Sequence, residues 1–140
     1  MRTADQESSY RAIERLIATY AELVDDGDFA AVGLLLADAT FVGGAGSVSG
    51  RDAIEKMLVE NVIVYDDGTP RTKHVTTNLG IEVDDAVGTA ISRSYFTALQ
   101  ALPDLPLQPS SAGGTTTVSS GVTGSGALWR GAFKRISLAI

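Results

Sequence analysis

The sequence has no cysteine and only one histidine, His74, in 140 residues. The absence of cysteine excludes disulfides, thiol nucleophiles and thiolate metal sites. One histidine among scattered carboxylates argues against a dedicated zinc site. The glycine-rich stretch Gly43–Gly50 lacks phosphate-loop spacing and a following lysine, so it predicts a turn rather than a nucleotide site. We therefore expect neither a metal nor a cofactor.

Positive charge is also scarce, with 11 Lys and Arg against 17 Asp and Glu and a net charge of −6. No basic run is present that could neutralise phosphates, which argues against a nucleic-acid partner. The apolar runs are too short to span a membrane. The first residues, MRTADQESSYR, contain no apolar core of a signal peptide. These features predict a cytoplasmic protein.

The N-terminal half of the sequence has helical periodicity. Apolar residues from Tyr10 to Val24 recur at spacings of three and four, which predicts an amphipathic helix over about Asp5 to Asp25. Further helices are expected over Phe29–Leu36 and Arg51–Asn61. The expected capping residues are Thr3 with Gln6 for the first helix, Asp28 for the second, and Ser49 with Asp52 for the third.

The C-terminal half changes to a period of two. Polar residues from His74 to Asn78 alternate with an apolar series from Val75 to Val83, which predicts a strand with His74 on its polar face. Other expected segments are a short strand at Ala39–Val42, later strands at Val87–Leu99, Thr115–Val122 and Leu128–Leu138, and a loop marked by Pro103, Pro106 and Pro109. Helices followed by a run of strands predict one α+β domain over residues 1–140.

Asp25 and His74 are the candidate catalytic pair. A buried carboxylate that orients one imidazole is a minimal general-base device. The helix dipole disfavours Asp25 at a helix C-terminus, and a histidine that donates its ring N–H would compensate. Two alternatives remain open from the residues alone. Asp25 could be a turn residue in an Asp-rich cluster, and His74 could face solvent on the outer side of a sheet.

Five segments resemble the SnoaL-like, nuclear-transport-factor-2-like superfamily, in order along the chain. They are YAELVDDGDF (Tyr20–Phe29), VSGRDAI (Val48–Ile54), TKHVTTN (Thr72–Asn78), SRSYF (Ser92–Phe96) and WRGAFKRISL (Trp129–Leu138). The resemblance implies a cone-shaped half-barrel, with three N-terminal helices packed on a strongly curved mixed β-sheet around an apolar pocket. Members include scytalone dehydratase, hexachlorocyclohexane dehydrochlorinase, bile-acid dehydratase, polyketide cyclases and non-catalytic binding modules.

The resemblance also implies roles for particular residues. The dehydratase and dehydrochlorinase branches carry an aspartate–histidine dyad at nearly the spacing of Asp25 and His74, which implies a cofactor-free lyase. Tyr20 would be a pocket hydroxyl or a core tyrosine. Lys134 and Arg135 are consecutive in a strand, so one of the two side chains should point inward. There it could stabilise a developing anion. The alternative is that this residue is a solvated charge on the strand. Four aromatic residues are expected in the core and pocket wall: Phe41, Tyr95, Phe96 and Trp129.

One segment departs from the family pattern. Residues Gly113–Val122 read GGTTTVSSGV, where the family has a segment similar to GRYHDRFERV. One added base after the Gly113 codon and a compensating loss before the Val122 codon would convert the first reading into the second. We hypothesise that the segment is frameshifted, and the alternative is a genuine Thr/Ser-rich edge strand. The printed residues lack bulky side chains, which also favours the rival function of a non-catalytic binding module.

The sheet's outer surface is expected to contact another subunit. The strand Val87–Leu99 carries few charges, so its outward face would be partly covered in a homodimer, with a trimer as the alternative.

A polyketide cyclase, in which an aspartate alone could handle the proton of an aldol closure, is a further alternative function.

Overall fold

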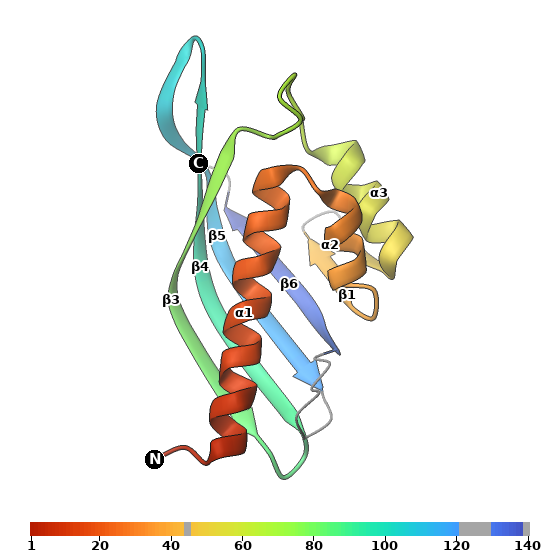
Figure 1. Cartoon of the computed structure of the whole chain (residues 1–140), viewed down its shortest axis with the longest axis vertical. Coiled ribbons are helices and arrows are strands. Elements are labelled where there is room, and N and C mark those ends of the chain that lie inside the picture. The colour runs from red at the N-terminus through yellow and green to blue at the C-terminus, as the bar shows by residue number, and fades with distance from the viewer. Residues whose placement is uncertain (44–45, 121–129, 139–140) are drawn as a thin grey trace.

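Three helices pack against one face of a six-stranded sheet (Figure 1). The computed structural model describes the backbone of residues 1–43, 46–120 and 130–138, and the side chains of residues 1–42 and 46–115. The helices are α1 (Ala4–Asp26), α2 (Phe29–Leu35) and α3 (Arg51–Asn61). The strands are β1 (Thr40–Gly43), β2 (Gly46–Ser49), β3 (Thr72–Asp84), β4 (Thr89–Leu102), β5 (Leu105–Ser120) and β6 (Arg130–Leu138).

The sheet has the strand order β2-β1-β6-β5-β4-β3. The pairing of β1 with β6 is parallel and the other pairings are antiparallel, so the sheet is mixed. In Figure 1, α1 lies along the inner face of the curved sheet, while α2 and α3 cover the end where β1 lies. The predicted α+β architecture, with helices packed on a curved mixed sheet, is confirmed.

The helix ends follow the predicted capping in two of three cases. Thr3 and Gln6 form a reciprocal capping box on α1, and the Asp28 carboxylate accepts the backbone N–H of Ala31 at 3.0 Å to cap α2. The prediction for α3 was wrong. Its N-cap is Gly50, without a side-chain cap, and the Ser49 hydroxyl lies 2.8 Å from the Thr40 hydroxyl instead.

Two segments predicted as turn or loop are strands. Gly43–Gly50 contains β2, which pairs with β1 as a hairpin. Pro106 and Pro109 lie within β5 rather than in a loop. The described pairing of β5 with β6 begins only at Ala112, so both prolines lie where β4 is the only described neighbour. Proline has no backbone N–H to donate. Its absence is tolerated where a strand has a neighbour on one side only, because no second strand needs that donor.

The suspect segment Gly113–Val122 is a strand as far as Ser120, and Val122 lies outside the described residues. The edge position given in the alternative to the frameshift hypothesis is wrong, because β5 lies between β4 and β6. The Thr and Val residues of the printed segment favour β-structure.

A bulge in β3 changes which side chains face the helices. The register with β4 shifts between Thr77 and Gly80, and Asn78 has a φ of 54°. Asparagine tolerates this left-handed conformation better than most residues. Before the bulge His74 faces α1, and Val75 is 43% exposed. After it, the apolar residues face inward and pack under α1: Leu79, Ile81 and Val83. The predicted uninterrupted alternation from His74 to Val83 was therefore wrong.

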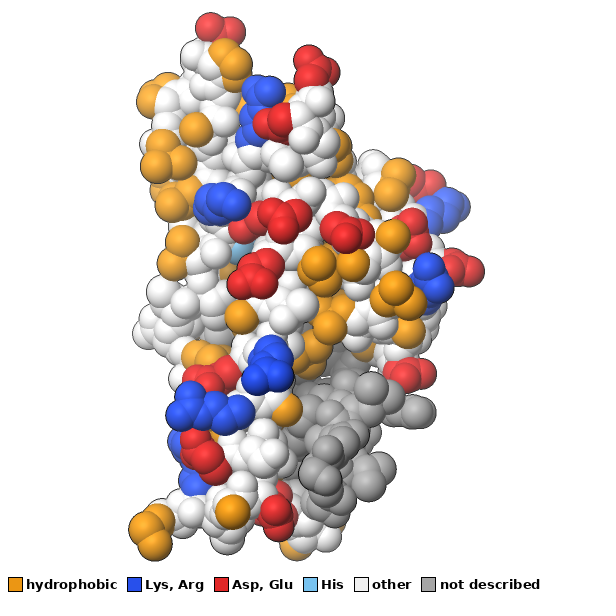
Figure 2. Space-filling model, viewed as in Figure 1, with side chains coloured by type: hydrophobic (Ala, Val, Ile, Leu, Met, Phe, Trp, Pro, Cys, Tyr) orange, Lys and Arg blue, Asp and Glu red, His pale blue; other side chains and the backbone are white. Residues whose placement is uncertain are grey.

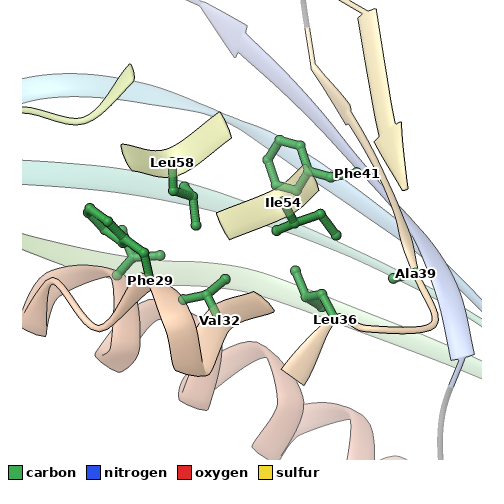
Figure 3. Close-up of a cluster of buried hydrophobic side chains, with 8 residues drawn as sticks. Phe29, Val32, Leu36, Ala39, Phe41, Ile54 and Leu58 are labelled. Carbon is green, nitrogen blue, oxygen red and sulfur yellow. The ribbon is translucent and has the colours of Figure 1, made fainter. Parts of the chain in front are cut away.

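Two groups of buried apolar side chains form the core. The larger group joins the three helices to β1 (Figure 3), and it consists of Val24, Phe29, Val32, Leu36, Ala39, Phe41, Ile54 and Leu58. The smaller group lies under the N-terminal half of α1 and consists of Ile13, Ile17 and Ala90. Burying one such aliphatic or aromatic side chain contributes roughly 1.5–3 kcal/mol. The candidate site lies on α1 between the two groups.

Candidate active site

Asp25 lies in the last turn of α1 and is 7% exposed. Its Oδ2 accepts the backbone N–H of His74 at 2.7 Å. Its Oδ1 accepts the Thr72 hydroxyl at 2.8 Å and lies 2.6 Å from His74 Nδ1. A helix C-terminus and a buried position both disfavour a carboxylate, so these donors compensate for the charge. The carboxylate fixes both the backbone of β3 and the imidazole.

The loop that leads into β3 brings Thr72 and His74 to Asp25. Gly27 ends α1 with a φ of 74°, and a Cβ at this position would collide with the Gly68 carbonyl. Asp67 holds the same loop by accepting the backbone N–H of Thr69 and the Arg71 guanidinium, each at 3.0 Å. The Thr69 N–H, followed by Arg71, holds the pKa of the Asp67 carboxyl below its usual value. A tight turn therefore sets the dyad geometry.

The His74 ring has one nitrogen that the dyad does not use. Its Nδ1 is directed at a carboxylate, which only accepts, so in the neutral ring Nδ1 carries the proton and Nε2 keeps its lone pair. The side chain is 11% exposed, and its ring centroid lies 6.0 Å from that of Phe96. Asp25 thus holds the ring through Nδ1, and Nε2 is the nitrogen available to a ligand.

His74 lines a cavity between α1 and the inner face of β3, β4 and β5. The space between its walls is about 410 Å3, including that open to solvent at its mouth. The lining residues are Ile17, Tyr20, Ala21, His74, Thr76, Ser94, Phe96 and Thr115. The wall is mostly apolar with several hydroxyl groups, and Tyr20 and Phe96 lie in it as expected.

A second hollow lies on the other side of the dyad, open to solvent and about 820 Å3 in extent. It is bordered by Glu22, Asp25 and Asp26 on α1 and by Lys73, His74 and Thr76 on β3. Figure 2 shows the acidic side chains gathered beside the histidine on this face. The dyad therefore lies between a mostly apolar cavity and an acidic groove.

The other predicted pocket residues lie elsewhere. Phe41 is 7% exposed and belongs to the larger core group, not to the described cavity lining. Tyr95 is 61% exposed on the outer face of β4, because Ser94 and Phe96 take the inward positions. Its expected place in the pocket wall is therefore corrected to the sheet's outer surface. Trp129 lies outside the described residues, and so do the side chains of Lys134 and Arg135, although their backbone pairs with Thr116 and Thr115 respectively.

Sequence reasoning missed three hydroxyl residues of the site. Thr72 supplies a hydrogen bond to Asp25, while Ser94 and Thr115 line the cavity. Thr72 could have been found, because it lies two residues before His74 on the same strand face. The inward direction of Ser94 and Thr115 depends on strand register, which the alternation of one isolated strand does not fix.

The described residues hold no group of three or more His, Cys, Asp and Glu side chains arranged as metal ligands. None of the helices in the described part of the chain has the length and apolar character needed to cross a membrane.

Comparison with solved structures shows the same fold in proteins of low sequence identity. A substituted form of Rv3472, a function-unknown protein from Mycobacterium tuberculosis, is 19% identical, with a TM-score of 0.75 over 96% of this chain and 75% of that one. An NTF2-like protein with a cystatin-like fold from Novosphingobium aromaticivorans is 19% identical, with a TM-score of 0.70 over 95% and 88% of the two chains. A putative scytalone dehydratase from the same organism is 20% identical, with a TM-score of 0.71 over 99% and 89%.

At these identities the structural likeness shows the fold alone. No curated protein matches the sequence significantly. The family comparison is more informative, because the model of the SnoaL-like domain matches residues 6–134. The chain therefore belongs to the SnoaL-like domain family.

Proposed function

We propose that this protein is a cofactor-free lyase that catalyses β-elimination from a small, largely apolar substrate, with loss of water or halide. His74 Nε2 removes a proton from a carbon made acidic by a neighbouring carbonyl or halogen. The C–H electron pair becomes the new C=C bond, and the leaving group departs from the adjacent carbon. Asp25 holds the imidazole in the required tautomer and stabilises the imidazolium that forms.

The observation that carries this proposal is the 2.6 Å contact between Asp25 Oδ1 and His74 Nδ1 beside a mostly apolar cavity. A general base needs an oriented ring and a free nitrogen that faces the substrate. A pure binding module has no need for a buried carboxylate that orients an imidazole, so the contact favours the enzyme over that alternative. A polyketide cyclase that relies on an aspartate alone is also disfavoured, because His74 separates Asp25 from the apolar cavity.

The cavity wall would supply the remaining chemistry. Tyr20, together with Lys134 or Arg135, would polarise the substrate oxygen or the departing group. The apolar side chains Ile17 and Phe96 exclude water and so strengthen these interactions. Departing hydroxide needs a proton, which one of the polar groups or water would provide.

We also propose that the protein is a homodimer that covers the outer face of the sheet, with a trimer as the alternative. Val75 and Tyr95 are exposed there by 43% and 61%. They lie diagonally opposite each other on β3 and β4, since Val75 pairs with Thr97 and Thr77 with Tyr95. Light scattering should give twice the mass of one chain, and a Tyr95→Glu variant should shift the mass toward the monomer. A monomeric wild type would contradict the proposal.

The proposed activity is tested with a panel of hydroxy-ketone and halogenated substrates. His74→Ala and Asp25→Asn should each lower the elimination rate by about 10²–10⁴-fold, the usual contribution of a general base. Asp26→Asn is the matched control, because Asp26 is the exposed neighbour of the buried Asp25. Elimination that survives His74→Ala undiminished would show that His74 is not the base.

A further inference from the structure

Ser94 is a buried residue whose side chain carries a hydroxyl in the cavity wall. It lies on β4, where the outward positions on either side are Arg93 and Tyr95. Ser94 itself is 6% exposed and borders the same cavity as His74. Its direct partner across the sheet, Thr115, lines the cavity as well. Two hydroxyl-bearing side chains therefore occupy directly paired positions in a wall that also contains the apolar Ile17, Ala21 and Phe96.

The Ser94 hydroxyl has no hydrogen-bond partner among the described residues. Folded proteins pair the large majority of buried polar side-chain atoms, because an unpaired one keeps the full cost of its desolvation. A buried hydroxyl that borders a cavity can be satisfied by whatever occupies that cavity. Ser94 is therefore suited to bind a ligand rather than to hold the fold together.

Ser92 provides an internal comparison. It lies on the same strand and the same face, is 3% exposed, and also has no hydrogen-bond partner among the described residues. It pairs with Ile81 under α1 and does not line the cavity. The two serines thus share chemistry and burial and differ in access to a ligand.

We propose that Ser94 binds an oxygen atom of the substrate, so that the site selects oxygenated substrates over halogenated hydrocarbons. This inference rests on the proposed function, because it places the substrate beside His74 Nε2. A serine hydroxyl both donates and accepts, so it pairs equally with a carbonyl or a hydroxyl. Chlorine bound to carbon is a poor acceptor and would leave the buried hydroxyl unpaired. Sites built to pair a substrate hydroxyl reject analogues that lack it.

The geometry makes the inference specific for one part of the substrate. Thr76 lies between His74 and the β3 bulge on the same inward face, and it pairs with Phe96 of β4. His74 itself pairs with Ala98, so the inward positions of β4 run from Ala98 through Phe96 to Ser94. Ser94 is therefore farther from the imidazole along β4 than Phe96 is. A substrate held at Ser94 would extend its carbon skeleton along Phe96 toward His74. The oxygen recognised by Ser94 therefore belongs to the end remote from the proton that His74 removes.

The test compares two probes of similar size, cyclohexanone and chlorocyclohexane, by NMR titration of the whole protein. The variants are Ser94→Ala, the matched control Ser92→Ala, and His74→Ala. Ser94→Ala should weaken cyclohexanone binding by about 10–100-fold, the effect of one lost partner in a buried site, and leave chlorocyclohexane binding unchanged. Ser92→Ala should bind both probes as the wild type does.

Three outcomes would overturn the proposal: equal weakening of both probes by Ser94→Ala, unchanged cyclohexanone binding, or no binding of cyclohexanone to the wild type. Ser94→Ala should fold, because among the described residues the buried Ser94 hydroxyl makes no hydrogen bond that the substitution would break. Its thermal midpoint should equal or exceed that of the wild type. The titration measures binding without turnover, so it can fail or succeed independently of the lyase assay. If the wild type shows no elimination activity but His74→Ala still prefers cyclohexanone, the lyase proposal is refuted and the Ser94 proposal stands.

Discussion

Asp25 holds His74 at two points, with Oδ2 accepting the backbone N–H at 2.7 Å and Oδ1 lying 2.6 Å from the ring Nδ1. The same carboxylate therefore joins α1 to β3 and sets the direction of the imidazole. This double role means that stability and catalysis should respond together when Asp25 is changed.

Asp25→Asn should lower the free energy of unfolding by about 1–3 kcal/mol. Asparagine keeps the size of the side chain but has only one acceptor oxygen for the donors of Thr72 and His74, which leaves buried donors unpaired. Denaturant unfolding measures the change. Asp26→Asn, at the exposed neighbouring position, should alter the free energy by no more than about 0.5 kcal/mol. Equal effects of the two variants would contradict the role given to Asp25.

Gly27→Ala should destabilise the protein and displace the dyad. The φ of 74° at Gly27 costs an L-residue roughly 1–2 kcal/mol, and its Cβ would also collide with the Gly68 carbonyl. Gly68→Ala is the control, because its φ of 80° carries a similar backbone cost while the space around it is open. Only Gly27→Ala should also shift the His74 ring resonances. Indistinguishable spectra for the two variants would argue against this loop as the element that positions His74.

Arg135, rather than Lys134, should be the basic residue that affects activity. Residues directly opposite each other in an antiparallel pair share a face of the sheet, and Arg135 pairs with the cavity residue Thr115. Lys134 pairs with Thr116, the next position along the strand. Arg135→Ala should lower the elimination rate by about 10-fold or more, as expected for loss of a charge-stabilising group, and Lys134→Ala should leave it nearly unchanged. The reverse ranking would show that the register argument fails.

The frameshift hypothesis for Gly113–Val122 predicts a change in the cavity. Replacing the segment by GRYHDRFERV includes Thr115→Tyr, which puts a bulky ring at a position that lines the cavity. We expect the replaced chain to retain the fold and to bind smaller probes than the printed chain does. Resequencing of the gene is the direct check. One uninterrupted reading frame through this segment, shared by close relatives, would refute the hypothesis.

Much of the fold could be predicted because its signals are local. The 3.6-residue periodicity of α1, the caps at Thr3 and Asp28 and the change to a two-residue period depend on neighbouring residues alone. The family segments added the architecture and the pairing of Asp25 with His74. These features required no knowledge of how distant strands align.

Two of the errors have their cause in long-range strand register. The bulge at Asn78 turns Leu79 inward after His74, and nothing in the alternating pattern marks the reversal. A shift of one residue likewise separates the expected pocket residue Tyr95 from the inward neighbours Ser94 and Phe96. Which side chains of a strand face the cavity is decided by its pairing with the neighbouring strands. The sequence of one strand does not specify that pairing.

The central claim is that Asp25 fixes His74 as the Nδ1–H tautomer, with Nε2 as the base. NMR of protein labelled with ¹⁵N at histidine tests this directly, because the chain has a single imidazole and no substrate is needed. In the neutral ring the account predicts a protonated Nδ1 and a proton-free Nε2, with this preference lost in Asp25→Asn. A proton on Nε2 with a bare Nδ1 in the wild type would contradict the account, because no lone pair would then face the cavity.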